Sequence, residues 1–128
     1  MKVLIDTHTF LWWNTEDPQL SALVKGIIAD GQNDIFLSAA SVWEIAIKHA
    51  LGRGDMPVSS QDAVRYFRES GYRFLAIEAE HAMAVEDLAA HHQDPFDRIL
   101  IAQALTEPMR LLSRDATVAA YGEMVLAV

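Results

Sequence analysis

The sequence has 128 residues, of which 52% are hydrophobic and 22% are charged. This length and apolar content predict one domain, residues 1–128, around a single core. No apolar stretch approaches the roughly 20 residues of a membrane span, and no secretory signal is visible. The absence of cysteine excludes disulfides, thiolate nucleophiles and thiolate metal sites. We therefore expect a soluble cytoplasmic protein.

The formal net charge of −8 argues against a broad surface for nucleic acid, because phosphate attraction needs basic side chains. The charges are unevenly distributed, however. Between positions 48 and 73 there are five basic and three acidic residues, which leaves −10 for the rest of the chain. The basic residues of this segment are Lys48, Arg53, Arg65, Arg68 and Arg73. An acidic body with one basic segment is compatible with a phosphate-bearing substrate.

Short apolar runs alternate with helical patterns along the chain. The expected strands span residues 3–5, 35–37, 73–77, 111–112 and 125–126, and the expected helices span residues 20–29, 38–51, 61–69, 78–91, 94–106 and 116–121. Gly31, Gly52, Gly71 and Pro108 follow four of the helices and are typical stop signals. Alternating strands and helices predict an α/β fold with a mainly parallel sheet covered on both faces, that is, three α/β/α layers.

Two aspartates follow expected strands directly. Asp6 ends the first strand, and Asp115 lies two residues beyond the strand that closes at Ser113. Sites in parallel sheets form beyond the carboxyl ends of the strands, so both are candidates for a functional site. Each has an equally good structural interpretation, as the N-cap of a helix that starts near Thr9 or at Ala116.

Three further acids are less straightforward to interpret. Asp94 and Asp97 flank Pro95-Phe96, and a helix start accounts for both, with Asp94 as N-cap and Asp97 favoured by the helix dipole. Glu44 interrupts a largely apolar helical stretch. Lys48, four residues on, allows an ordinary exposed ion pair, but an acid in this setting favours a function.

Four acids thus arrive on separate elements and are able to meet at one edge of the sheet: Asp6, Glu44, Asp97 and Asp115. Clustered carboxylates repel one another and raise one another's pKa, so a fold keeps them only with compensation. Oxygen ligands without cysteine suit Mg²⁺ or Mn²⁺. Such an ion neutralises charge on a phosphodiester and activates water for its hydrolysis.

The sequence resembles PIN-domain proteins of the VapC toxin type. The matching segments are VLIDTH at 3–8, SAASVWEIAIK at 38–48, DPFDRILIAQA at 94–104 and LLSRD at 111–115. The resemblance implies a sheet of order 3-2-1-4-5 and a Mg²⁺- or Mn²⁺-dependent ribonuclease that hydrolyses RNA with Asp6, Glu44, Asp97 and Asp115. It also implies a homodimer and a VapB-like antitoxin as partner. Asp94 belongs to a subgroup signature, and Ser113 stands where the family often has a supporting hydroxyl.

Other residues have simpler interpretations. The spacing of His8, His91 and His92 matches no tetrahedral zinc site, so surface or packing roles are expected, with His8 a candidate for the site edge. The aromatic side chains of residues 10, 12 and 13 are expected in the core or a dimer contact. For Arg98, an ion pair with a neighbouring acid is expected rather than a phosphate contact.

Three rival functions remain open. A Mg²⁺-dependent phosphoacceptor domain also uses strand-end aspartates, but it needs an acidic pair after the first strand, where Thr7-His8 stands here. A haloacid-dehalogenase-like phosphatase needs a second acid at position 8, where the chain has His8. The third rival is a non-catalytic interaction module that keeps the PIN fold. Cleavage of radiolabelled RNA with Mn²⁺ separates the first two from a ribonuclease, since neither would cut it.

Overall fold

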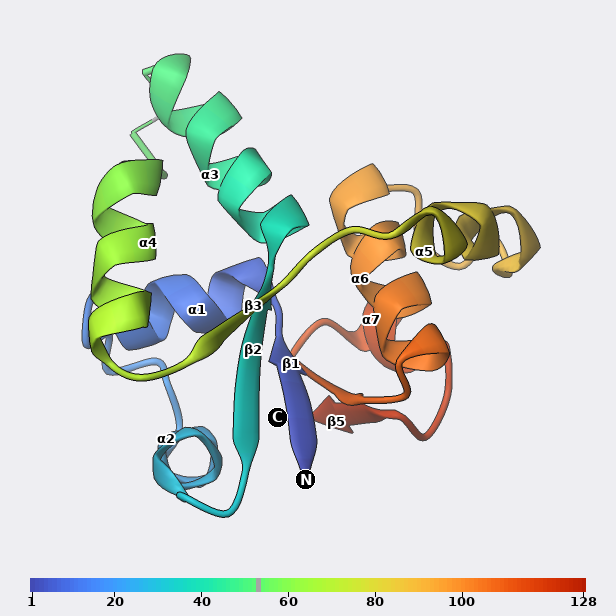
Figure 1. Ribbon diagram of the computed structural model, residues 1–128, viewed down its shortest axis with the longest axis horizontal. Coiled ribbons are helices and arrows are strands. Elements are labelled where there is room, and N and C mark those ends of the chain that lie inside the picture. Colours follow the sequence, from blue (N-terminus) through green and yellow to red (C-terminus); the bar gives the residue numbers. More distant parts are fainter. Residues whose placement is uncertain (53) are drawn as a thin grey trace.

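The computed structural model describes residues 1–52 and 54–128 and has one parallel sheet between two layers of helices (Figure 1). The strands are β1 (Lys2–Ile5), β2 (Asp34–Ser38), β3 (Arg73–Leu75), β4 (Arg110–Ser113) and β5 (Val125–Ala127). Their order is β3-β2-β1-β4-β5, and every neighbouring pair is parallel. The predicted α/β class and the order 3-2-1-4-5 are therefore confirmed.

The helices are α1 (Thr7–Asn14), α2 (Ala22–Ala29), α3 (Ala39–Ala50), α4 (Ser60–Glu69), α5 (Ala79–Ala84), η1 (Val85–Asp87), α6 (Pro95–Thr106) and α7 (Ala116–Ala119). Figure 1 shows α1, α2 and α4 on one side of the sheet and α5, α6 and α7 on the other. None of the helices in the described ranges is long and apolar enough to cross a membrane.

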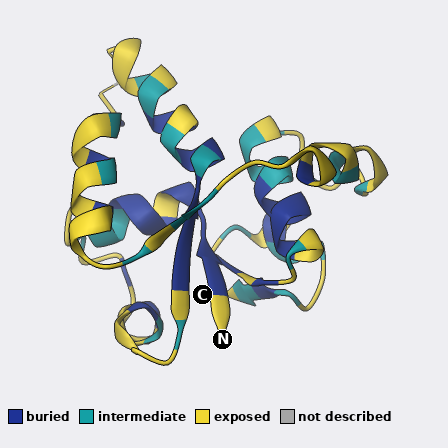
Figure 2. Cartoon of the chain, in the orientation of Figure 1, coloured by how far each residue is buried: buried dark blue, intermediate teal, exposed yellow. Residues whose placement is uncertain are grey.

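The protein has two hydrophobic cores, one on each face of the sheet. Side chains that alternate along the strands contribute to both. In β1, Val3 and Ile5 pack with α1, α2 and α4, whereas Leu4 packs with α6 and α7. Because successive side chains of a strand point to opposite faces, a short apolar run in a central strand supplies both cores. Figure 2 shows the central strands buried and the outer surfaces of α2 and α4 exposed. The carboxyl ends of β1, β2 and β4 therefore come together at one edge, where α1, α3 and α7 begin.

Two helices differ from the sequence prediction. Helix α1 was expected only as the helix near Thr9 that Asp6 would cap, because its apolar residues are consecutive rather than spaced along one face. The helix expected over 78–91 ends early, as α5 and the short turn η1, and Leu88 is extended. The Arg98 guanidinium donates to the carbonyl oxygens of Val85 and Ala89 (3.1 Å each), so these carbonyls have partners outside a helix.

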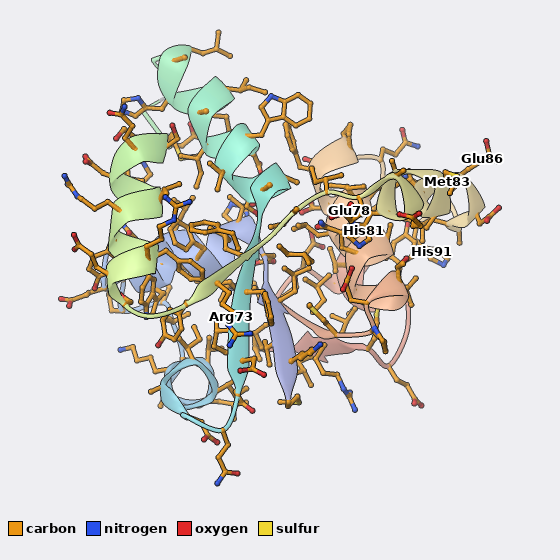
Figure 3. All side chains as sticks on the ribbon, viewed as in Figure 1. Arg73, Glu78, His81, Met83, Glu86 and His91 are labelled. Carbon is orange, nitrogen blue, oxygen red and sulfur yellow. The ribbon has the colours of Figure 1, made fainter. Side chains whose placement is uncertain are left out.

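His81, which is 1% exposed, attaches helix α5 to the end of α6. Its Nδ1 accepts the Glu78 backbone N–H (2.9 Å), and its Nε2 pairs with Glu107 just after α6. In Figure 3, Met83 and Glu86 lie farther out on the same segment. The contact holds the short helix against α6 although most of its residues are exposed.

One member of the predicted basic segment, Arg53, lies outside the described residues.

Candidate active site

Asp6 and Asp115 lie at adjacent strand ends, as the sequence predicted. Strand β1 pairs with β4 in parallel register, with Ile5 beside Leu112. Asp6 follows β1 and its side chain is buried, with 5% exposure. Asp115 follows β4 and is partly exposed. The two carboxylates are thus delivered to the same edge of the sheet.

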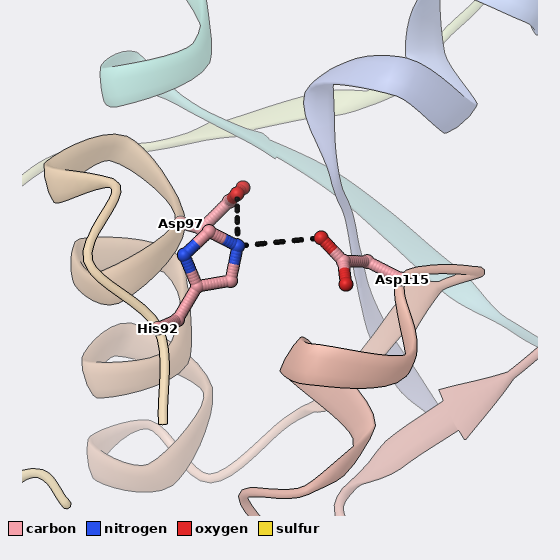
Figure 4. A group of neighbouring side chains, drawn as sticks. All are labelled: His92, Asp97 and Asp115. Carbon is pink, nitrogen blue, oxygen red and sulfur yellow. Dashed lines mark hydrogen bonds and ion pairs between the residues drawn. The ribbon is translucent and has the colours of Figure 1, made fainter. Parts of the chain in front are cut away.

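Asp97 and Asp115 are bridged by a histidine (Figure 4). His92 Nε2 lies 3.0 Å from Asp97 Oδ2 and 3.3 Å from Asp115 Oδ2. One ligand atom from each of these three side chains lies within 4.8 Å of the others. The surface or packing role expected for His92 is therefore wrong. His91 does pack, edge-on against the ring of Tyr121.

The protonation of His92 follows from its other ring nitrogen. Nδ1 accepts the Asp94 backbone N–H at 3.1 Å, so a neutral ring carries its proton on Nε2. That proton points to the oxygens of Asp97 and Asp115, where like charges would otherwise repel. His92 thus supplies a hydrogen-bond donor at the position where a cation is expected to bind.

Glu44 enters the site from α3 and is held by a small polar network. It is 7% exposed, and its Oε1 accepts a hydrogen bond from the Thr7 hydroxyl at 2.8 Å. Thr7 Oγ1 also lies 2.9 Å from Ser41 Oγ. Glu44 Oε2 pairs with Lys48 Nζ at 2.7 Å, the ion pair that helical spacing allowed. These partners compensate the burial of the carboxylate and fix it in place.

The pKa of the Asp97 carboxyl is influenced by its burial and by three other acids. Burial, together with the charges of Asp94, Asp6 and Glu44, raises the pKa of the Asp97 carboxyl from 3.8 to about 6, while His92 acts in the opposite direction. The charges of Asp6 and Glu44 therefore act on the Asp97 carboxyl, whereas the ligand atoms that lie within 4.8 Å of one another are those of His92, Asp97 and Asp115.

Asp115 behaves in the opposite way. Its limited burial favours the neutral form, but hydrogen bonds from the Thr117 backbone and from His92 outweigh it and lower the pKa of the carboxyl below 3.8. Ser113 Oγ accepts the Asp115 N–H at 3.1 Å, so this buried hydroxyl orients the loop. The site thus pairs an acid that is reluctant to ionise with one that ionises readily, a pattern common at functional sites.

The capping interpretation of the aspartates is also correct. Asp6 Oδ1 accepts the Thr9 N–H at 2.8 Å, Asp94 Oδ1 accepts the Phe96 N–H at 2.8 Å, and Asp115 Oδ1 accepts the Thr117 N–H at 2.8 Å. In each case the cap uses Oδ1, and Oδ2 is left for another partner. Capping and ligand roles are therefore compatible in the same side chain.

Arg98 organises the segment that carries His92. Its guanidinium donates to the carbonyl oxygens of Val85, Ala89 and His92 (3.1 Å each) and to the Tyr121 hydroxyl (3.2 Å). The Tyr121 hydroxyl also accepts the His92 N–H at 2.9 Å. Within the described residues Arg98 contacts no carboxylate, so the expected ion pair is wrong. It is a structural residue that places His92.

The donor set fits a divalent cation. Carboxylate oxygens are typical ligands of Mg²⁺ and Mn²⁺. Burial and then the neighbouring negative charges raise the pKa of the Asp97 carboxyl, and a bound cation opposes both effects. Asp6, Glu44, Asp97 and Asp115 are the residues available to hold such an ion, and Asp94 caps α6, the helix that carries Asp97.

The fold and this edge define a class: parallel α/β domains that gather acidic side chains beyond the carboxyl ends of their strands. The profile of the PIN domain family matches residues 3–123. The chain therefore belongs to the PIN domain family. Among curated proteins no match was found.

Three solved structures share this fold. VapBC2 from Rickettsia felis, bound to a DNA fragment from its promoter, has 13% sequence identity and a TM-score of 0.73, covering 100% of this chain and 98% of that one. FitAB bound to an IR36 DNA fragment has 18% identity and a TM-score of 0.63, with 98% and 94% covered. FitAcB from Neisseria gonorrhoeae has 19% identity and a TM-score of 0.60, with 91% and 89% covered.

Proposed function

We propose that this chain, acting as one domain in the cytoplasm, is a metal-dependent endoribonuclease and the toxin of a VapBC-type pair. PIN domains are generally nucleases and typically use a divalent metal. The observation that carries the proposal is the raised pKa of Asp97 inside a group of carboxylates. A cation is the partner that such a group lacks, and a phosphodiester is a substrate that needs its charge neutralised.

In this proposal Asp6, Glu44, Asp97 and Asp115 hold one or two Mg²⁺ or Mn²⁺ ions. When bound, the metal neutralises phosphate charge and makes water a stronger acid. Thr7 and Lys48 fix Glu44, and Ser113 orients Asp115. His92 is placed to donate its Nε2 proton to an oxygen in the site, and Asp94 caps α6 so that Asp97 faces inward.

Incubation of end-labelled single-stranded RNA with the purified protein tests this function. We expect cleavage with Mn²⁺ or Mg²⁺ and none with EDTA, and the downstream products should carry a 5′-phosphate. This end group identifies hydrolysis by water, because attack by the RNA 2′-hydroxyl leaves a 5′-hydroxyl instead. RNA that stays intact with both Mn²⁺ and Mg²⁺ would favour the non-catalytic module. Cleavage that persists in EDTA would show that the reaction does not depend on a metal.

Binding of the RNA backbone is expected to involve the basic segment. Arg65 and Arg68 line a groove of about 450 Å³ between α3 and α4, together with Val42 of α3. Changing both arginines to Gln should weaken RNA binding and lower the slope of log K against log salt by about 0.7 for each phosphate that the variant no longer neutralises. Fluorescence anisotropy at several salt concentrations measures this slope. An unchanged slope would place the RNA on another surface.

The proposed partner is a VapB-like antitoxin that presents a cation to the acidic site. The support is chemical, since converging carboxylates are a natural docking point for an arginine. A structure of the co-purified complex should place a basic side chain near Asp6 or Asp97. We further infer a homodimer, for which the exposed apolar residues Trp43 of α3 and Leu51 directly after it are candidate contacts. Light scattering measures that state.

A further inference from the structure

A second cavity lies between α1, α2 and the end of β4, and two of its lining residues are near acids of the candidate site in the chain. Its volume is about 220 Å³, and its lining includes Trp12, Gln19, Leu20, Val24, Arg114 and Val128. Thr9 completes the wall toward the acids, and its N–H is the one that binds the Asp6 carboxylate. Arg114 directly precedes Asp115. The cavity therefore lies within three residues of two of the proposed metal ligands.

Arg114 is held above an aromatic ring. Its guanidinium carbon lies 4.7 Å from the centre of the Trp12 ring. Leu112 packs on the α1 side of the sheet, and residues two apart in an extended segment point the same way, which explains why Arg114 emerges there. Among the residues that the structure describes, no carboxylate pairs with Arg114, whereas Lys48 and Arg65 both have acidic partners. Its charge is thus available to a ligand.

The chemistry of this cavity is that of a single-stranded nucleotide site. A guanidinium binds phosphate through paired N–H donors, and an indole ring stacks on any base. The apolar side chains of Leu20 and Val24 suit the face of a base. The volume is below the roughly 300–1,000 Å³ of pockets for drug-sized ligands and cofactors, and accommodates a single base.

We propose that the Trp12–Arg114 cavity binds the nucleotide of the RNA chain next to the bond that is cut. Arg114 binds its phosphate, and the base enters the cavity beside Trp12. This proposal rests on the ribonuclease function proposed above and adds a subsite to it. The nucleotide is held beside Asp6 and Asp115, so the subsite sets the register of the RNA over the acids.

The phosphate contact is tested by anisotropy with a fluorescein-labelled oligouridine in EDTA, where cleavage is not expected. Arg114→Gln should weaken binding and lower the slope of log K against log salt by about 0.7. The matched control is Arg110→Gln, at the other end of β4, whose guanidinium binds the Glu123 carbonyl. Equal slopes for Arg114→Gln and wild type, or equal losses for the two variants, would overturn the phosphate contact.

The base contact is tested by Trp12→Leu with the same RNA and with an abasic RNA of equal length. We expect roughly tenfold weaker binding of oligouridine, in line with the loss of one stacked base, and little change for the abasic chain. Trp12→Phe keeps an aromatic ring and should preserve most of the affinity. Equal losses for both RNAs would mean a merely structural role for Trp12. Neither assay requires cleavage, so failure of the subsite and failure of the nuclease function are distinguishable.

Discussion

Asp97→Asn should melt at a higher temperature than the wild-type protein when both are in EDTA at neutral pH. The carboxylate of Asp97 lies in a partly buried site beside Asp94, Asp6 and Glu44, and the amide removes its charge while still accepting the His92 Nε2 proton. A shift from 3.8 to about 6 corresponds to ~3 kcal/mol at most. Partial exposure reduces this to about 1–2 kcal/mol, or roughly 3–10 °C in Tm.

The pH dependence has a definite sign. The folded protein holds the Asp97 proton more tightly than the unfolded chain, because the pKa is raised from 3.8 to about 6. The associated stability is present in full below pH 3.8 and is lost as the pH rises through about 6. The increase in Tm of Asp97→Asn over the wild type should therefore be small near pH 4 and reach its full size above about pH 7. Thermal melts across this range measure it.

Asp62→Asn is the matched control, because Asp62 occupies the same third position of α4 that Asp97 occupies in α6. Asp62 is exposed and pairs with Arg65, so its substitution should not raise Tm. With Mn²⁺ at about tenfold excess over Kd, the wild type should gain ~1.4 kcal/mol, and Asp97→Asn should lose most of this gain. An Asp97→Asn protein that melts lower in EDTA yet keeps the full Mn²⁺ response would identify Asp97 as a helix-start residue only.

Asp6→Asn should abolish RNA cleavage, with a loss in kcat/KM of at least about a hundredfold, the size expected when one electrostatic group is removed from a catalytic site. Asparagine is as good an N-cap as aspartate, so the hydrogen bond to the Thr9 N–H and the start of α1 should survive. The substitution thus removes the negative charge of residue 6 while keeping its N-cap hydrogen bond. Circular dichroism and the melting curve check the fold, and end-labelled RNA reports the activity.

Asp94→Asn provides the comparison for that result. Asp94 is also an N-cap, and its Oδ1 accepts the N–H groups of Phe96 and Asp97. Because we assign it a positioning role, its conversion to Asn should leave cleavage near the wild-type rate. It should also lower the pKa of Asp97, since the charge of Asp94 helps to raise it. If Asp6→Asn and Asp94→Asn both cleave RNA at the wild-type rate, both residues are caps and nothing more.

The sequence predicted most of the fold because its strands are short apolar runs between clear helix boundaries. Val3-Leu4-Ile5 and Ile35-Phe36-Leu37 are buried on both faces, which is why they appear as continuous runs rather than alternating ones. Asp6 and Asp115 were recognisable from their positions at strand ends. Helix α1 was recognisable only from its possible N-cap, because the apolar residues at 10–13 are consecutive and have no helical spacing.

His92 could not be found from the sequence, because its position depends on contacts between distant residues. The loop that carries it is held by Arg98 and by the Tyr121 hydroxyl, which lies 29 residues from His92. No local pattern indicates that an arginine at the start of α6 will bind carbonyl groups and end the preceding helix. The arrangement of His92 between Asp97 and Asp115 is therefore a property of the tertiary structure.

The central claim is that the acids at this edge bind a divalent cation, and calorimetric titration with Mn²⁺ tests it most directly. The titration is best run well above pH 6, because Asp97 is then ionised and free to act as a ligand. We expect the wild-type protein to bind Mn²⁺ at this site. Asp6→Asn should bind it at least about tenfold more weakly, while Asp62→Asn should bind it as the wild type does. Absence of binding to the wild type, or an unchanged affinity in Asp6→Asn, would contradict the account.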